Sequence, residues 1–165
     1  MNSIFTRISV RKYKNKPVEE DKIRMLLKAA MAAPSTANQQ PWEFYVVTDK
    51  EIIKKLSETS PYSKSAAGAP VIIVPVFRKE GIPVQALATV DMSISLENIW
   101  LETDELGLGG VWMALHPDPT RVNAAREILN IPENLEPFAM FPLGYPAESR
   151  PQADRYDESR IHYVK

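Results

Sequence analysis

The hydrophobic positions before Pro34 recur at the spacing of an amphipathic helix. Residues 19–21 are acidic, which suits the positive end of a helix dipole, and the apolar face that follows comprises Ile23, Leu26, Leu27, Ala30 and Met31. We expect this helix to end near residue 33, because Pro34 disfavours helical geometry in the residue before it. Residues 42–48 are rich in aromatic and β-branched side chains and predict a strand.

A second helix and a second strand follow in the same order. Asp49 is a suitable N-cap, and the apolar face of the helix behind it comprises Ile52, Ile53 and Leu56. Residues 60–70 predict a loop or a short helix, and residues 71–77 (VIIVPVF) predict an apolar strand. Pro75 has no N–H group to donate, so we expect this strand at a sheet edge or at a bulge.

The longest predicted helix covers residues 83–106 and is apolar on most of its faces. Such a helix needs burial on more than one side, and a small domain rarely provides that alone, so we expect a partner subunit to cover part of it.

The last third predicts a strand at 110–115, a helix at 118–130 and a strand near 137–143. After Gly144 the sequence has two prolines, alternating charges and no sustained periodicity, which indicates an extended arm on a surface. We therefore expect one domain, residues 1–165, with a core at 1–144 and a C-terminal arm at 145–165.

Composition excludes several function classes. Twenty basic and 21 acidic side chains give a net charge of -1, so we expect neither nucleic acid nor a membrane as a partner. The absence of cysteine excludes disulfides, thiolate nucleophiles and Cys-ligated metals, and the two histidines lie too far apart for a local metal motif. No apolar run approaches the ~20 residues of a membrane helix, and no signal segment is evident, which predicts a cytoplasmic protein.

Two polar segments carry candidate chemistry. In RISVR, the alternating Arg7, Ser9 and Arg11 would project to one side of an extended backbone and could bind an anion, although a solvated basic patch is an alternative. Residues 34–41 (PSTANQQP) offer neutral donors and acceptors that suit the edge of a heteroaromatic ring, or ordinary turn chemistry. Together they suggest a pocket for a phosphorylated planar ligand.

These segments, with LGLGGVWMALHPD and PLGYPAE, closely resemble the FMN-dependent nitroreductase family over essentially the whole chain, in particular its short members. The resemblance implies an α+β fold, with a central, mostly antiparallel sheet flanked by helices. It also implies an intertwined homodimer with two FMN sites at the subunit interface, in which the long helix packs across the dimer and the C-terminal arm wraps the partner.

By the same resemblance, the N-terminal residues meet the phosphate, ribityl chain and pyrimidine edge of FMN, and loop 34–40 approaches from the other subunit. The segment 113–115 runs along the ring near N5, and a C-terminal cation meets the phosphate. The expected cofactor-binding residues are Arg7, Ile8, Ser9, Arg11, Pro34, Ser35, Thr36, Asn38, Gln40, Lys64, Met113, Ala114, Leu115 and Arg155. Two positions depart from the family pattern: Ala114 replaces a common glycine, and Gln152 replaces a common second cation.

The implied activity is a ping-pong oxidoreductase in which NADH or NADPH reduces FMN, and nitroaromatics, quinones or related small electrophiles reoxidise it. No side chain need be catalytic; Arg11 would support negative charge on the reduced ring near N1, and a backbone N–H near Leu115 would face N5. His116 and the tryptophans 42, 100 and 112 are expected in structural roles. Alternatives are a same-fold enzyme of other chemistry, such as reductive dehalogenation or flavin fragmentation, and a non-catalytic flavin-binding protein.

Overall fold

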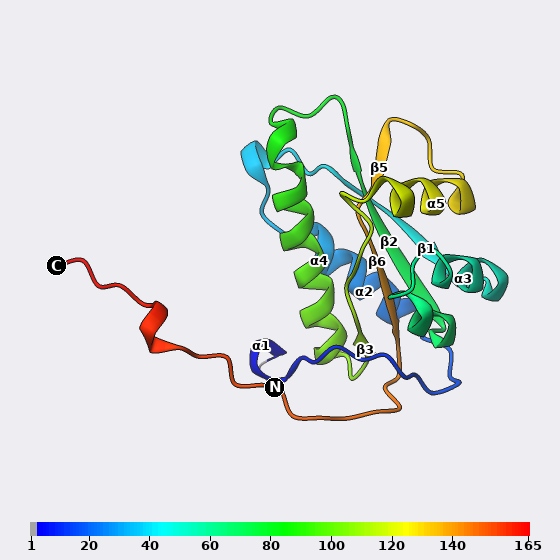
Figure 1. Ribbon diagram of the computed structural model, residues 1–165, viewed down its shortest axis with the longest axis horizontal. Coiled ribbons are helices and arrows are strands. Elements are labelled where there is room, and N and C mark those ends of the chain that lie inside the picture. The colour runs from blue at the N-terminus through cyan, green and yellow to red at the C-terminus, as the bar shows by residue number, and fades with distance from the viewer. Residues whose placement is uncertain (1–2) are drawn as a thin grey trace.

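A computed structural model describes residues 3–165; Met1 and Asn2 of the expected domain lie outside the described residues. A six-stranded sheet forms its centre (Figure 1), and all of its strand pairs are antiparallel. The main path runs β1-β2-β6-β3, while β4 pairs with β6 and β5 with β2. The strands are β1 (Trp42–Val47), β2 (Val71–Arg78), β3 (Gly109–Gly110), β4 (Met113–Ala114), β5 (Leu135–Pro137) and β6 (Ala139–Gly144).

Helices cover both faces of this sheet. The α-helices are α1 (Ser3–Thr6), α2 (Glu20–Met31), α3 (Lys50–Ser57), α4 (Ala88–Glu105) and α5 (Pro119–Leu129). Short 3₁₀ helices are η1 (Thr36–Asn38), η2 (Lys64–Gly68), η3 (Gln85–Leu87) and η4 (Glu158–Arg160). The expected cap is confirmed, since the Asp49 carboxylate accepts from the backbone N–H groups of Glu51 and Ile52, both at 2.9 Å. Asp118 caps α5 in the same way.

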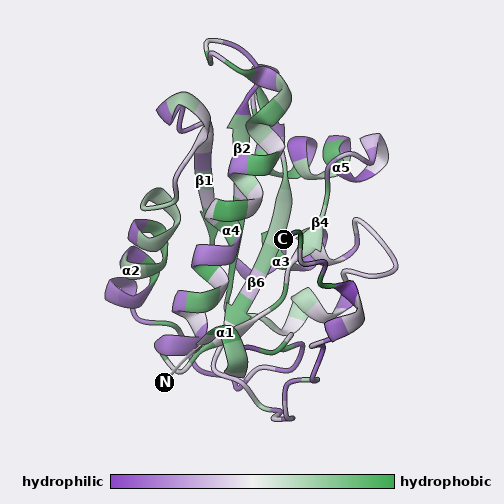
Figure 2. Cartoon of the chain, turned by 90° about the vertical axis from the view of Figure 1, so that its left-hand side faces the viewer, coloured by the Kyte–Doolittle hydropathy of each residue, from purple (hydrophilic) through white to green (hydrophobic). Residues whose placement is uncertain are grey.

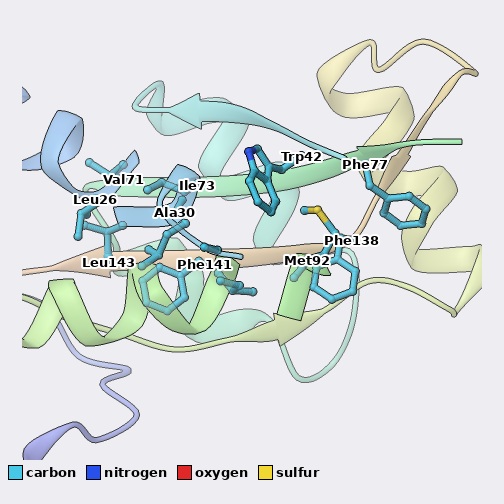
Figure 3. Packing of buried hydrophobic residues seen from close by; sticks show 14 of the residues in the cluster. Leu26, Ala30, Trp42, Val71, Ile73, Phe77, Met92, Phe138, Phe141 and Leu143 are labelled. Carbon is cyan, nitrogen blue, oxygen red and sulfur yellow. The ribbon is translucent and has the colours of Figure 1, made fainter. Parts of the chain in front are cut away.

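Alternation along β2 divides the core into two layers. Val71, Ile73 and Phe77 point into a cluster with α2 and α4, part of which Figure 3 shows around Phe141. Ile72, Val74 and Val76 point into a second cluster beneath α3 and α5. A strand covered on both faces must be apolar at every position, which explains the continuous run VIIVPVF. The expected α+β fold with a helix-flanked antiparallel sheet is confirmed.

The expectation that Pro75 places its strand at an edge is wrong, because β2 pairs with β1 on one side and with β6 and β5 on the other. The alternative of a bulge holds. β2 pairs with β6 up to Ile73 and with β5 from Val76 onward. Between these two pairings, the chain segment that faces β2 has one residue more than β2. Pro75 lies in that interruption, so no ladder hydrogen bond needs its missing N–H group.

The long helix α4 starts at Ala88, later than expected, because residues 85–87 form η3 instead. Its inner face is buried, but Leu87, Val90 and Ile94 are 40%, 50% and 36% exposed at its N-terminal half. Figure 2 looks onto this helix and shows hydrophobic segments along its outward side. This apolar surface is where we expected a partner subunit.

Two further expectations need adjustment. The strand expected at 110–115 is two separate short strands, β3 and β4, both paired with β6. The chain after Gly144 leaves the sheet and contains η4 as its single helical element within the described residues. Near its start it runs along the N-terminal segment, where the Gln152 side chain donates to the carbonyl oxygens of Ile4 (3.1 Å) and Arg7 (2.9 Å).

Candidate functional site

A cavity of about 290 Å³ lies beside the edge strand β4, where the N-terminal segment, the loop after α3 and the start of α5 meet. The residues around it are Arg11, Thr59, Ser60, Tyr62, Ser63, Val111, Trp112, Met113, Ala114, Leu115, Arg121 and Met140. It thus joins Arg11 to the expected segment 113–115. Ligand sites are typically concave and combine apolar surface with a few polar groups, and this cavity has both kinds of lining.

The backbone of β4 presents a free edge to the cavity. The Leu115 N–H donates to the Phe138 carbonyl at 3.1 Å, so the donor expected there already has a partner. In an antiparallel ladder, successive residues point their N–H and C=O groups to opposite sides. The N–H and C=O groups of Ala114 must therefore point away from β6. The carbonyl oxygen does so, since it accepts a hydrogen bond from Arg121 Nη1 at 3.4 Å. The Ala114 N–H is consequently the donor directed toward a ligand in this cavity.

Two arginines give the cavity a positive charge. Arg11 is exposed, and its backbone N–H donates to the Glu148 carboxylate at 2.6 Å. Arg121, on α5, lies 3.2 Å from the Asp118 carboxylate, and its guanidinium lies 5.7 Å from the centre of the Tyr62 ring. Sequence reasoning did not single out Arg121, although a basic residue three positions after an N-cap Asp at a loop-to-helix junction was a usable signal.

The loop between α3 and η2 was also missed as a site element. The Ser63 hydroxyl is buried and donates to the carbonyls of Ser57 (3.0 Å) and Ser60 (2.8 Å), so it shapes the loop from within. The Thr59 hydroxyl likewise donates to the Leu56 carbonyl at 2.8 Å. The cluster of serines and threonines in this stretch was the available signal. Because these hydroxyls are used internally, they make a defined wall instead of a set of free donors.

Arg7 and Ile8 do not line this cavity; they line a much smaller hollow next to Trp100. The Arg7 guanidinium stacks 3.9 Å from the centre of the Trp100 ring, and its Nε lies 3.7 Å from Glu97 Oε1. Burial raises the pKa of Glu97, while the charge of Arg7 opposes that rise. Ser9 pairs with Gly110 in an isolated parallel bridge. The structure therefore does not bring Arg7 and Arg11 onto one cavity.

The expected loop 34–40 lies elsewhere, against the N-terminal half of α4 (Figure 1). Thr36 bonds to the buried Asp91 carboxylate, and the Ser35 hydroxyl accepts from the Gln40 N–H at 3.0 Å. Pro34, Asn38 and Gln40 are exposed. Since α4 covers the opposite sheet face from α3 and α5, this loop and the cavity cannot enclose one ligand within a subunit.

The remaining expected residues lie apart. Lys64 is exposed at the start of η2 and borders a surface hollow that shares Ser60 with the cavity. Arg155 is exposed on the arm, where its Nη1 donates to the Ala153 carbonyl at 3.4 Å. His116 lies outside the cavity, with Nδ1 3.6 Å from Glu136 Oε1, which fits the structural role expected of it.

The tryptophans divide between core and cavity. Trp42 is buried in the core, and Trp100 packs edge-on to Phe141. Trp112 packs against Phe138 and also lines the cavity, so one of the three takes part in the candidate site as well as in packing. No group of three or more potential metal-ligating side chains occurs in residues 3–165.

The groups that line the cavity suit a flavin mononucleotide. Val111, Trp112, Met113 and Met140 provide apolar surface for a planar ring, and the Ala114 N–H faces outward from the strand edge. Arg11 supplies a cation for an electron-rich ring edge or a phosphate. At about 290 Å³ the cavity is at the lower limit for ligand sites, so a second wall is needed to enclose such a ligand.

The fold and the cavity define an α+β protein suited to a planar anionic cofactor, and comparisons with known proteins agree. The nitroreductase family model matches residues 4–61 and 57–145. A protein of Methanothermobacter thermautotrophicus, provisionally named NADH dehydrogenase/NAD(P)H nitroreductase, is 39% identical over 165 residues, which cover 100% of this chain and 86% of the relative.

Solved structures agree equally well. One from Clostridium acetobutylicum, provisionally named an NADH oxidase, is 43% identical with a TM-score of 0.95, covering 99% of both chains. An FMN-dependent nitroreductase from Clostridium difficile R20291 is 30% identical with a TM-score of 0.92, covering 99% of this chain and 98% of that one. The chain belongs to the nitroreductase family and is an oxidoreductase.

Proposed function

We propose that this protein binds FMN and uses NADH or NADPH to reduce nitroaromatics, quinones or related small electrophiles by a ping-pong mechanism. The observation that carries the proposal is the cavity beside β4, where an outward backbone N–H, a flanking arginine and an apolar floor occur together. Bound FMN would supply the redox chemistry between the nicotinamide and the acceptor. Two substrates that use the same exposed ring face in turn give ping-pong kinetics.

The protein's own groups would orient and tune the ring. The Ala114 N–H would donate to the ring near N5. Arg11 would stabilise negative charge at the pyrimidine edge, as preorganised cations do at sites of developing charge. Trp112 and Met113 would exclude water from the covered face. This chemistry would need no side-chain nucleophile and no catalytic triad.

The proposal includes a homodimer. Loop 34–40 is exposed next to the apolar surface of Leu87, Val90 and Ile94, on the sheet face opposite to the cavity's helices. We propose that a second copy packs on that surface and that its loop reaches past the sheet edge at β4 to supply the missing wall of the cavity in the first copy. Residues 145–165 would extend along the partner, with Arg155 at the phosphate.

We also infer a cytoplasmic location, where NADH and NADPH are supplied. Among residues 3–165, no helix has the length and apolar character needed to cross a membrane.

The test is anaerobic stopped-flow on protein reconstituted with FMN. We expect bleaching of the flavin absorbance by NADH or NADPH, followed by rapid recovery on addition of a nitroarene or quinone. Tight FMN binding without reduction by either nicotinamide would favour the flavin-binding protein, and reduction with turnover of only a halogenated phenol would favour the dehalogenase. A protein that binds no FMN would contradict the proposal entirely.

A further inference from the structure

The carboxylate of Asp91 is buried in the first turn of α4, with 2% of the residue exposed. Its Oδ1 accepts from the Thr36 backbone N–H at 2.9 Å and from the Thr36 hydroxyl at 3.1 Å. Its Oδ2 accepts from Gln39 Nε2 at 2.6 Å. All three of these hydrogen bonds come from loop 34–40. A buried charge is costly unless hydrogen bonds compensate it, so the carboxylate and the loop depend on each other.

The loop that Asp91 holds is strained. Ala37, Asn38 and Gln40 have φ values of 49°, 53° and 43°, a region that side chains with a Cβ rarely adopt. Such strain persists only where the surrounding structure over-determines the backbone, and it concentrates at functional sites. A simple connection between α2 and β1 would not need three such residues.

Gln39 makes the Asp91 contact specific for a carboxylate. The Val84 N–H donates to Gln39 Oε1 at 2.9 Å, and Gln39 Nε2 donates to the Val84 carbonyl at 3.2 Å. These bonds fix the orientation of the amide, so its NH₂ group must face Asp91. An asparagine at position 91 could not accept from both Thr36 and Gln39, because one of its two polar atoms is itself a donor.

We propose that Asp91 is a positioning residue for the flavin site: it holds loop 34–40 in the strained conformation that presents Asn38 and Gln40 to the flavin bound by the partner subunit. This inference rests on the proposed function and deepens it. Asp91 touches neither flavin nor substrate, and it acts through Thr36 and Gln39. The buried Gln39, which donates to Asp91, accordingly helps to position the same loop, although the resemblance did not place Gln39 at the cofactor.

The experiment compares Asp91→Asn with Ser95→Ala in the full-length protein. Ser95 lies one turn further along the buried face of α4, and its hydroxyl donates to the Ala30 carbonyl at 3.0 Å, so its loss removes a buried polar contact to α2 instead of to the loop. The readouts are the FMN dissociation constant from flavin fluorescence, the midpoint potential of bound FMN, and the melting temperature of the apoprotein.

We expect Asp91→Asn to weaken FMN binding at least tenfold and to shift the midpoint potential, while Ser95→Ala stays within twofold of wild type in binding. Lower melting temperatures in both variants with unchanged FMN affinity and potential would overturn the inference, because Asp91 would then be a purely structural residue. Equal loss of affinity in both variants would also overturn it. If Asp91→Asn does not fold, Gln39→Met removes the Oδ2 contact from the other side and is judged by the same criteria.

The two proposals fail in different ways. Wild-type protein that binds no FMN contradicts the proposed function. Wild-type protein that binds FMN, with Asp91→Asn and Gln39→Met binding it equally well, contradicts the role of Asp91 alone.

Discussion

Replacing Arg7 by methionine separates two roles that this residue could have. In the structure its guanidinium stacks on Trp100 at 3.9 Å, and its Nε lies 3.7 Å from Glu97 Oε1, with side-chain exposures of 19% for Arg7 and 45% for Glu97. A partly desolvated cation–π contact contributes about 0.5–2 kcal/mol, and a half-exposed ion pair contributes about 0.2–1 kcal/mol. We therefore expect Arg7→Met to destabilise the apoprotein by about 1–2 kcal/mol. For a chain of this size that corresponds to a fall in melting temperature of about 2–8 °C.

The effect on cofactor binding is a separate expectation. If Arg7 also binds the FMN phosphate, losing a charge-assisted hydrogen bond costs about 1.5–3 kcal/mol, which raises the dissociation constant by about 10- to 100-fold. The measurements are calorimetric melting of the apoprotein and titration with FMN. Glu97→Gln is the control, because it retains the stack on Trp100 but removes the competing carboxylate, and we expect it to bind FMN as tightly as wild type or more tightly. A lower melting temperature with an unchanged FMN dissociation constant in Arg7→Met would refute the phosphate role and leave Arg7 as a packing residue.

Three further predictions test the fold, its acid stability and the cavity. Gly110→Ala would place a Cβ 2.6 Å from the Phe141 ring, so urea unfolding should show a loss of about 1–3 kcal/mol. A hydrogen bond from Tyr145 is the main cause that lowers the pKa of Glu19 from the ordinary glutamate value of 4.5 to about 2. Ionised Glu19 therefore stabilises the protein fully above pH 4.5, and this stabilisation is lost as the pH falls toward 2. Glu19→Gln should therefore unfold with a shallower pH dependence in that window. Arg121→Met should lower the midpoint potential of bound FMN by about 10–20 mV in a spectroscopic titration, a small effect because Asp118 already pairs with the arginine.

The elements that the sequence predicted well are those in which one residue pattern decides the structure. The predicted helices at 118–130 and before Pro34, and the strands at 42–48 and 71–77, agree with α5, α2, β1 and β2 to within a few residues. Their periodicity, caps and breakers are local properties, so no tertiary information was needed.

The failures arose where pairing decides the structure. β3 and β4 are two residues each and exist because β6 lies beside them, and no local pattern distinguishes them from the single strand that was expected. Pro75 marked an irregularity correctly, but the sequence could not show that it lies opposite the change of partner from β6 to β5. Whether a strand is central depends on residues far along the chain.

The candidate site shows the same division. Segment 113–115 and Arg11 meet as the resemblance implied, whereas Arg121 and the wall at 59–63 join them only through the packing of α5 and α3 on the same sheet face. The donor at β4 shifted from Leu115 to Ala114 because ladder alternation, which depends on register with β6, decides which N–H is free. Gln152 also has a role that the sequence did not indicate, since its amide fastens the arm to the N-terminal segment.

The expected cofactor-binding residues lie in separate parts of the subunit, and this separation argues for sites that are shared between two subunits. Arg11 and the segment 113–115 open on one region of the subunit, while loop 34–40 is fixed to α4 on the other side of the sheet. A carboxylate buried at Asp91 and a strained backbone at 37–40 are costs that packing alone does not explain, because neither brings apolar area into the core. These costs are offset if the loop contacts a ligand held by another copy, and the exposed Leu87, Val90 and Ile94 beside it supply an apolar surface through which that copy would bind. Dimerisation and cofactor binding would then stabilise each other, so added FMN should shift the dimer equilibrium of the wild-type protein, and do so less in Asp91→Asn.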